Sequence, residues 1–331
     1  MVATILTSPT PSSSPLALIA SDMQALDQVI AQRLDTSVAM IGQVARYIIA
    51  AGGKRLRPAL VLLTAGALGV ASADKYKLAA VVELIHTATL LHDDVVDEST
   101  MRRGRPTANE TFGNPASVLV GDFLHTRSFQ MMVEVGSLPI LKVLSDATNI
   151  IAEGEVMQLI NTHDADLDEA GYLHVIRSKT AKLFEASAQI AAQLAGASAE
   201  IGAACATYGQ ALGTAFQIID DVLDYDGDAQ EMGKNLGDDL REGKNTLPLI
   251  IAMQRASAHD AAVVRSAIEN GSTEQLQAIL HIVRSTGALD ATREAAHAEA
   301  LRAIAALAAL PGNAYTEAMR DLASQLLLRR T

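Results

Sequence analysis

Two aspartate-rich motifs have the composition and spacing of a divalent-cation site. In the first motif Asp93 and Asp97 are four residues apart, so on a helix their carboxylates lie one turn apart on the same face. One such motif could equally be a solvated acidic surface, but a second copy with the same helical spacing favours a site. Because Mg²⁺ takes oxygen ligands and keeps room for water and phosphate, we expect two helices to face each other across a Mg²⁺-binding cleft. The second motif consists of Gln217, Asp220, Asp221 and Asp224.

Two basic segments have the composition of anion sites. In AGGKRLRP, residues 51–58, a Gly-Gly turn precedes a predicted helix start and gathers Lys54 and Arg57. Free backbone N–H groups and the helix dipole add to side-chain charge at such a position. In MRRGRP, residues 101–106, we expect a loop in which Arg102 and Arg103 point in opposite directions, so that each could bind a different diphosphate.

Other polar residues lie close to these motifs in the predicted helices and loops. His86 is seven residues before Asp93 and shares its helical face, which favours a phosphate contact over a purely structural role. The Gly-rich stretch 226–246 carries Lys234 and Lys244 and is predicted to be a mobile loop that closes over a phosphate. Thr180 interrupts an apolar helix, where its hydroxyl could also simply bond a backbone carbonyl.

Composition favours an all-α protein. Of 331 residues 49% are hydrophobic and only 9 are Pro, and no Gly-rich nucleotide-binding turn occurs. The net charge of −12 argues against a nucleic-acid partner. The lone Cys205 excludes an internal disulfide and, with no apolar run of membrane-spanning length, indicates a cytoplasmic protein. We expect a disordered leader over residues 1–19 and a single helical bundle around a deep central cavity over residues 20–331.

Five motifs together resemble the all-trans prenyl diphosphate synthases, an all-helical, dimeric family of isoprenoid synthases. The resemblance covers residues 20–331 and is closest to the bacterial long-chain branch that makes octaprenyl (C40) diphosphate for quinones such as ubiquinone. It implies repeated condensation of isopentenyl diphosphate with an allylic diphosphate, with farnesyl diphosphate as the expected starter. The motifs, in the family's order, are GGKRLRP, LLHDDVVDESTMRRG, SKTAKLF, FQIIDDVLDY and GKNLGDDLREGKNTLPL.

The resemblance also implies residue roles, a cofactor and an assembly. Three Mg²⁺ ions per active site and a homodimer are expected, with at most a transient membrane contact when the apolar product leaves. The implied Mg²⁺ ligands are Asp93, Asp97, Asp220 and Asp224; isopentenyl diphosphate is expected on Lys54, Arg57, His86 and Arg103; the allylic diphosphate is expected on Arg102, Lys179, Thr180, Gln217, Lys234 and Lys244, of which Lys179, Thr180 and Gln217 are the expected catalytic residues.

Two small residues predict a long product. Helical side chains tilt toward the N-terminus, so a chain growing from Asp93 would pass Thr89 and Ala88, where an aromatic side chain would stop it. Both residues are small, so the product is expected to extend further. The residues that close the far end of the cavity are not identified by the sequence; Phe123, Met131, Met132 and Leu144 are candidates.

Three other functions are less consistent with the sequence. A terpene cyclase would lack the GGKRLRP segment and would line its cavity with aromatic residues, whereas aromatics are 3% of this chain. A non-catalytic subunit of a heteromeric synthase would be expected to have lost one of the motifs, and all are present. A di-iron bundle could use the Glu-x-x-His pairs at Glu83 and Glu294, but it would leave both Asp motifs unexplained.

Overall fold

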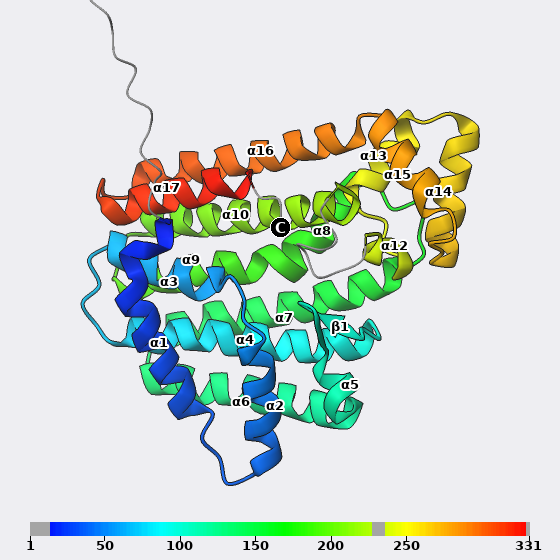
Figure 1. The fold of residues 1–331 in the computed structure, drawn as a ribbon. Helices are drawn as coiled ribbons and strands as arrows, with labels where there is room; N and C mark the ends of the chain where they lie inside the picture. The colour runs from blue at the N-terminus through cyan, green and yellow to red at the C-terminus, as the bar shows by residue number, and fades with distance from the viewer. Residues whose placement is uncertain (1–13, 227–235, 329–331) are drawn as a thin grey trace, which may run out of the picture.

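The centre of the molecule is built from helices that are apolar on nearly every side. In α4 (Asp74–Val96) the residues from Leu78 to Val82 are all fully buried, and α9 (Lys182–Leu194) and α10 (Ala199–Asp226) are buried over most of their lengths. A helix of this kind needs neighbours on all sides. Accordingly α4 packs against α3, α6 and α9, while α10 packs against α9 and α16, so that the helices lie in stacked layers (Figure 1).

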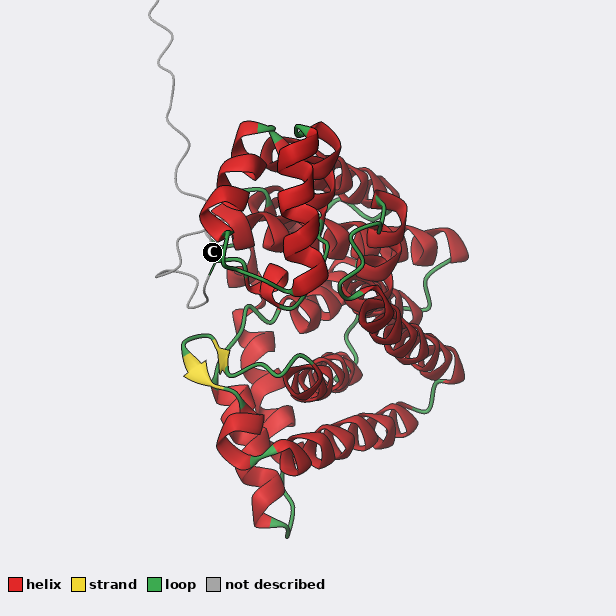
Figure 2. Cartoon of the chain, turned by 90° about the vertical axis from the view of Figure 1, so that its right-hand side faces the viewer, coloured by secondary structure: helices red, strands yellow, loops and turns green. Residues whose placement is uncertain are grey.

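The computed structural model describes residues 14–226 and 236–328. Within these ranges all regular secondary structure is helical except for one small hairpin (Figure 2). The prediction of a single-domain, all-α bundle is therefore confirmed. In chain order the elements are η1 (Pro15–Ile19), α1 (Ala20–Arg33), α2 (Ala39–Ala50), α3 (Leu56–Ala67), α4 (Asp74–Val96), β1 (Met101–Arg102), β2 (Arg105–Pro106), α5 (Ala108–Phe112), α6 (Asn114–Val135), α7 (Leu138–Asn161), α8 (Glu169–Ile176), η2 (Arg177–Ala181), α9 (Lys182–Leu194), α10 (Ala199–Asp226), α12 (Asp238–Arg241), α13 (Leu247–Arg255), α14 (Ala258–Asn270), α15 (Leu276–Ser285), α16 (Ala288–Ala306), η3 (Leu307–Ala309) and α17 (Ala314–Leu326).

The folded chain starts earlier than the predicted boundary at residue 20. Residues Pro15–Ile19 form a 3₁₀-helix, η1, which packs against α3 and α17. Ile19 is fully buried, so the end of the predicted leader belongs to the hydrophobic core rather than to a disordered segment. The remainder of that leader, residues 1–13, lies outside the described residues.

The basic segment after α4 forms a hairpin rather than the expected loop. Met101 pairs with Pro106 and Arg102 with Arg105 in the two short antiparallel strands. Arg103 and Gly104 form the turn in left-handed backbone conformations, with φ of 51° and 71°. The hairpin fixes the backbone of both predicted diphosphate-binding arginines.

Within the described residues no helix is both long enough and apolar enough to cross a membrane.

A glycine contact controls how closely α9 and α10 approach. A Cβ added to Gly209 of α10 would overlap the carbonyl oxygen of Phe184, which is backbone and cannot turn away. We predict that Gly209→Ala lowers the free energy of unfolding by about 1–3 kcal/mol, as overpacking does. Chemical denaturation would measure this loss. Gly202→Ala, on the same helix with open space around the new Cβ, is the control and should be neutral or slightly stabilising.

Candidate active site

A half-buried arginine on the first turn of α3 forms one part of the site. The Arg57 guanidinium lies over the ring of Phe184, 4.5 Å from its centroid, and its Nη1 is 3.2 Å from Nε2 of His86. Burial lowers the pKa of Arg57 to about 10, which still leaves it charged at neutral pH. Burial, followed by the charges of Arg57, Arg102 and Arg103, also lowers the pKa of His86 well below its usual value. His86 is therefore neutral and surrounded by guanidinium groups.

The predicted isopentenyl diphosphate residues lie together in this region. Arg103 in the hairpin turn rests against Gly53: a Cβ on Gly53 would be 2.8 Å from its Nη1. This contact brings the hairpin beside the chain that carries Lys54, which is exposed and makes interactions of its own. Besides burial, the positive charges of Arg57, Arg102 and Arg103 lower the pKa of His86. Cations from α3, the segment before it and the hairpin thus converge beside the neutral His86, which suits an anion of high charge.

Glu83 is a carboxylate in this cationic cluster that the motif analysis did not assign to it. Its carboxylate is 3.8 Å from Nε of Arg55, and one of its oxygens is buried without a hydrogen-bond partner. Burial raises the pKa of Glu83, and the charges of Arg55, Arg57 and Arg103 oppose that rise. Glu83 precedes His86 by three residues, so helical spacing alone could have indicated it.

The first aspartate motif divides into residues that face a cavity and one that does not. Asp93 and Asp97 line a cavity of about 280 Å³ at the end of α4. Burial raises the pKa of Asp93. The charge of Lys179 opposes this rise, and repulsion from Asp97 adds to it. Asp94, only 1% exposed, instead accepts hydrogen bonds from Arg102 Nη2 at 2.7 Å and Arg102 Nε at 3.0 Å. In the structure Arg102 of β1 thus pairs with Asp94 of α4, and its contact with the allylic diphosphate stays a prediction.

Lys179 lies in a π-helical turn, η2, between α8 and α9. Such turns are rare and often mark functional sites. The turn is close to α7: a Cβ on Gly154 would be 2.8 Å from the backbone nitrogen of Lys179. The ammonium group of Lys179 pairs with Glu155 at 2.6 Å. Burial and the neighbouring charge of Asp93 raise the pKa of Glu155 to about 7.

The second motif is tied to the same turn by a chain of hydrogen bonds. The hydroxyl of Thr180 donates to Gln217 Oε1 at 3.0 Å, and Gln217 Nε2 donates to Asp221 Oδ1 at 2.7 Å. Asp221 Oδ2 in turn accepts from the hydroxyl of Tyr172 at 2.5 Å. All four side chains, with Lys179, line a second cavity of about 140 Å³. The expected catalytic residues are thereby brought together.

The two cavities share a wall. Gln158, Thr162 and Lys244 line both of them. The Lys244 ammonium is 3.1 Å from Asp97 and 2.5 Å from Glu242. Although burial lowers the pKa of Lys244, the surrounding carboxylates raise it above its usual value. Lys244 therefore links the loop before α13 to the first motif, whereas Lys234 lies outside the described residues.

The donor atoms are chemically suited to Mg²⁺. Asp224, 8% exposed, accepts a hydrogen bond from the backbone nitrogen of Asp239 at 3.3 Å, and Asp220 is half-buried with interactions of its own. Within residues 14–226 and 236–328 no three acidic, His or Cys side chains are close enough to hold a metal between them. Carboxylate oxygens are the donors that Mg²⁺ prefers, and it usually takes one or two carboxylates and completes its shell with water and substrate phosphate. The assignment of Asp93, Asp97, Asp220 and Asp224 as ligands stays a prediction.

The two predicted chain-length residues lie on α4, on the N-terminal side of Asp93. Ala88 is 1% exposed and packs in the main hydrophobic core. Thr89 is half-buried, and its hydroxyl donates to the carbonyl oxygen of His86 at 2.9 Å. Further along the same helix Ile85, Leu84 and Val81 are buried, so the predicted path for a growing chain leads into apolar surroundings.

The site also contains residues that the sequence motifs did not identify. Glu155 and Tyr172 belong to helices outside the recognised motifs, so only the fold brings them to the site. Asp239 lies inside a recognised motif, but its spacing relates it to no other carboxylate; the structure places it on the wall of the second cavity.

These features define a class of protein: an all-α bundle in which two aspartate motifs face clustered arginines and lysines. The sequence profile described as "Polyprenyl synthetase" matches residues 38–284. The chain belongs to the polyprenyl synthetase family, and the predicted resemblance to all-trans prenyl diphosphate synthases is confirmed. The terpene cyclase and di-iron alternatives are thereby excluded.

Curated relatives within the family make long-chain products. The chain is 51% identical to the octaprenyl diphosphate synthase of Escherichia coli over 307 residues, which are 92% of this chain and 95% of that protein. It is 47% identical over 308 residues to an all-trans-nonaprenyl-diphosphate synthase (geranyl-diphosphate specific) of Rhodobacter capsulatus, covering 93% of this chain and 94% of that protein. The predicted enzyme class, a long-chain polyprenyl diphosphate synthase, is confirmed.

Solved structures share the whole fold. A polyprenyl synthase from Caulobacter crescentus, complexed with calcium and isoprenyl diphosphate, is 44% identical with a TM-score of 0.93 and covers 98% of this chain and 100% of that one. A decaprenyl diphosphate synthase from Rhodobacter capsulatus is 44% identical with a TM-score of 0.90, covering 96% of this chain and 98% of that one. The family's use of divalent metal agrees with the carboxylate donors described above.

The environment of His86 predicts a pH dependence of stability. Because the folded protein lowers the pKa of His86, protons bind the unfolded chain preferentially once the pH falls below about 6.5. Its stabilising contribution is complete above that pH and is lost as the pH falls toward the folded pKa. Each unit by which folding lowers the pKa of His86 corresponds to about 1.4 kcal/mol in the free energy of unfolding. Denaturant titrations at pH 7 and pH 5 should therefore show a smaller acid loss for His86→Gln than for wild type.

The exposed His259 provides the control for this measurement. His259→Gln should leave the acid loss unchanged. An acid loss that is the same in His86→Gln and wild type would contradict a neutral His86 whose pKa is lowered by its surroundings.

Proposed function

We propose that this enzyme condenses isopentenyl diphosphate repeatedly with an allylic diphosphate, starting from farnesyl diphosphate, to form octaprenyl (C40) diphosphate for quinone side chains such as that of ubiquinone. The observation that carries the proposal is the convergence of two aspartate motifs with Lys179, Lys244 and the Arg57–His86 cluster in a chain 51% identical to an octaprenyl diphosphate synthase. The proposed place of action is the cytoplasm, with transient membrane contact when the apolar product leaves.

Two anion sites of different character support two diphosphate substrates. Arg57, His86 and Arg103, with the neighbouring Lys54, are proposed to hold isopentenyl diphosphate, since guanidinium groups bind phosphate oxygens in pairs. Lys179 and Lys244, which border the second cavity, are proposed to hold the allylic diphosphate with Arg102 and Lys234. Bound Mg²⁺, proposed as three ions on the two aspartate motifs, would neutralise charge on the diphosphate that leaves.

The reaction follows from this placement. The allylic C–O bond breaks as the positive charge of Lys179 and Lys244 stabilises the departing diphosphate. The electron-poor allylic carbon is then attacked by the double bond of isopentenyl diphosphate held beside Arg57. Thr180 and Gln217 present oxygen atoms toward the second cavity, where partial negative charge favours the cationic carbon. The departed diphosphate accepts the proton that is lost, so no separate side-chain base is needed.

Product length is proposed to depend on the small residues of α4. A chain growing from Asp93 passes Thr89 and Ala88 and then enters the apolar region around Ile85. Eight units is the proposed length, supported by the octaprenyl synthase relative. Relatives described as nonaprenyl and decaprenyl synthases are 47% and 44% identical to this chain. A product of nine or ten units would therefore require a different position only for the far end of the cavity.

Product analysis tests this proposal directly. Purified enzyme with Mg²⁺, farnesyl diphosphate and labelled isopentenyl diphosphate should give a dominant C40 product. Asp93→Ala should reduce the rate by at least about 100-fold, because charge stabilisation of the leaving group is lost. Ala88→Phe and Thr89→Phe should each stop growth at about C20, one unit beyond the C15 starter, since an aromatic ring fills the path.

Two aromatic variants are used because Ala88 is packed in the core, where a Phe could prevent folding. Thr89 is half-buried, so Thr89→Phe is the variant that is more easily accommodated. Unchanged product length in a folded Thr89→Phe enzyme would contradict the proposed path. An inactive wild type that remains folded would contradict the catalytic proposal and favour a non-catalytic subunit.

We also propose a homodimer formed through α6 and α7. Both helices expose large apolar side chains: Leu119 and Val133 on α6 are each 66% exposed, and Val156 and Ile160 on α7 are 56% and 73% exposed. Side chains of this size gathered on adjacent helices are typical of a protein interface. A second copy of the chain would bury them.

Light scattering after size-exclusion chromatography tests the assembly. Wild type should elute as a dimer, and Leu119→Glu should shift it toward monomer because a buried carboxylate without a partner is costly. Leu301→Glu is the matched control, since Leu301 is 51% exposed on α16, away from this surface. A dimer that survives Leu119→Glu combined with Val156→Glu would contradict the proposed interface.

A further inference from the structure

Thr180 and Gln217 belong to one continuous chain of hydrogen-bonded side chains that crosses three elements. It runs from Tyr172 on α8 to Asp221 and Gln217 on α10 and ends at Thr180 in the π-helical turn. Tyr172 is 3% exposed and Asp221 is 2% exposed. Buried polar groups of this kind are expensive unless every member is bonded. Here each link has a good distance, between 2.5 and 3.0 Å.

The direction of each hydrogen bond is determined by the groups available. Asp221 accepts at both oxygens, Oδ2 from the Tyr172 hydroxyl and Oδ1 from Gln217. Burial, followed by the charge of Asp239, raises the pKa of Asp221. Its hydrogen bonds with Tyr172 and Gln217 oppose that rise and favour the ionised form. An ionised carboxylate only accepts, so the Gln217 amide turns its Nε2 toward Asp221. Its carbonyl oxygen is then directed toward Thr180 and accepts from the Thr180 hydroxyl. Without Asp221 the amide could equally adopt the flipped orientation.

We propose that Tyr172 and Asp221 are positioning residues that hold the Gln217 amide with its oxygen, not its NH₂ group, toward the reacting allylic carbon. This inference rests on the proposed prenyl transfer. It assigns Asp221, which belongs to the second aspartate motif, an orienting role rather than a metal-binding one. It also gives a role to Tyr172, which none of the recognised motifs contains.

The orientation of this amide has a chemical consequence. In prenyl transfer the allylic carbon gains positive charge as the C–O bond breaks. An amide oxygen facing that carbon stabilises the charge, whereas an NH₂ group in the same place opposes it. A fixed orientation also avoids reorganising the amide during the reaction. The expected signature is therefore a change in kcat with little change in the KM for isopentenyl diphosphate.

The first test compares two tyrosine hydroxyls. Tyr172→Phe removes the hydrogen bond to Asp221, and Tyr208→Phe removes an equally buried hydroxyl that donates to the carbonyl oxygen of Met319 at 2.7 Å. Both variants lose one buried hydrogen bond, so both should melt at a lower temperature. Only Tyr172→Phe should lower kcat, by about tenfold or more, with the KM for isopentenyl diphosphate unchanged. Equal kcat values in the two folded variants would overturn the role of Tyr172.

The second test reverses the donor and acceptor. In Asp221→Asn the amide oxygen takes the place that accepts from the Tyr172 hydroxyl. The new NH₂ group then faces Gln217 and turns its amide around, so kcat should fall at least about tenfold. The double variant Asp221→Asn with Gln217→Glu has a carboxylate at residue 217. This carboxylate can accept from both the new amide at residue 221 and Thr180, and the total charge of residues 217 and 221 stays that of wild type. The double variant should therefore regain at least about tenfold in kcat over Asp221→Asn. Failure of the double variant to exceed the single one would contradict the orienting role.

Magnesium titration distinguishes positioning from metal binding. If Asp221 positions Gln217, Asp221→Asn should keep the half-saturating Mg²⁺ concentration of wild type; a rise of about tenfold or more would overturn the inference in favour of a metal ligand. The wild-type enzyme and Asp93→Ala are assayed alongside. An inactive wild type would count against the proposed function itself, whereas an active wild type with an unaffected Tyr172→Phe variant would overturn only this inference.

Discussion

Charge compensation in a partly buried space is the constraint on which the rest of this structure depends. The site gathers carboxylates from α4, α7 and α10 beside cations from α3, the hairpin, η2 and the loop before α13. Unpaired charge would be costly there, and the structure pairs it: Lys179 with Glu155, and Lys244 with Asp97 and Glu242. Burial, followed by repulsion from Asp93, raises the pKa of Glu155 to about 7.

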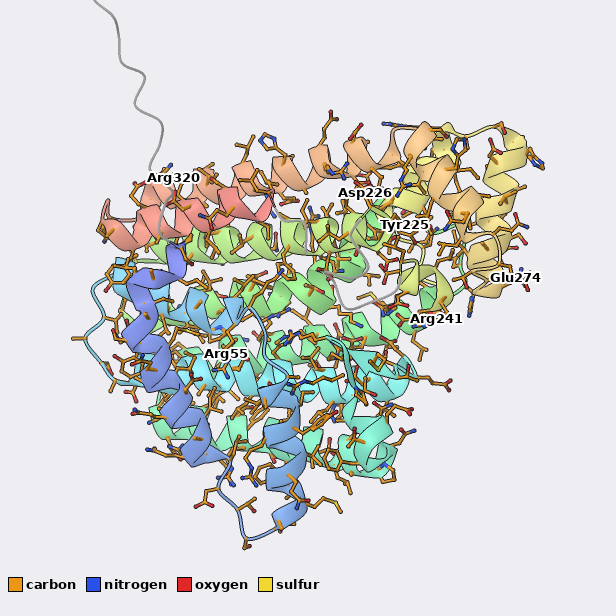
Figure 3. The ribbon with its side chains drawn as sticks, in the orientation of Figure 1. Arg55, Tyr225, Asp226, Arg241, Glu274 and Arg320 are labelled. Atoms are coloured by element: carbon orange, nitrogen blue, oxygen red, sulfur yellow. The ribbon has the colours of Figure 1, made fainter. Side chains whose placement is uncertain are left out.

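The bundle supplies the geometry that makes this pairing possible. Long helices that are apolar on nearly all sides keep α4 and α10 rigid, and glycines set how closely their neighbours approach. Gly154 of α7 lets that helix meet the π-helical turn that carries Lys179. Arg55 is the N-cap residue of α3 and Arg241 ends α12, and Figure 3 shows these two residues in separate parts of the fold. The functional groups therefore come from elements distant in sequence.

Much of this arrangement could be predicted from sequence, because the motifs encode helical spacing. The all-α bundle and the helical spacing of Asp93 and Asp97 follow from period and local composition, whereas the grouping of Thr180 with Gln217 is implied only by the family resemblance. The sequence could not show that Asp94 holds Arg102, since the pairing depends on the hairpin. Nor could it show Tyr172 or Glu155, which reach the site only through the packing of α8 and α7. The buried Ile19 likewise depends on tertiary contacts rather than on local sequence.

In the proposed reaction Lys179 and Lys244 exchange their carboxylate partners for the allylic diphosphate. A crystal structure with Mg²⁺ and an allylic diphosphate analogue carrying sulfur at the scissile position tests this exchange most directly. We predict that both ammonium groups contact diphosphate oxygens and that Lys179 has left Glu155. A bound analogue with Lys179 still on Glu155 and Lys244 still on Asp97 would contradict it.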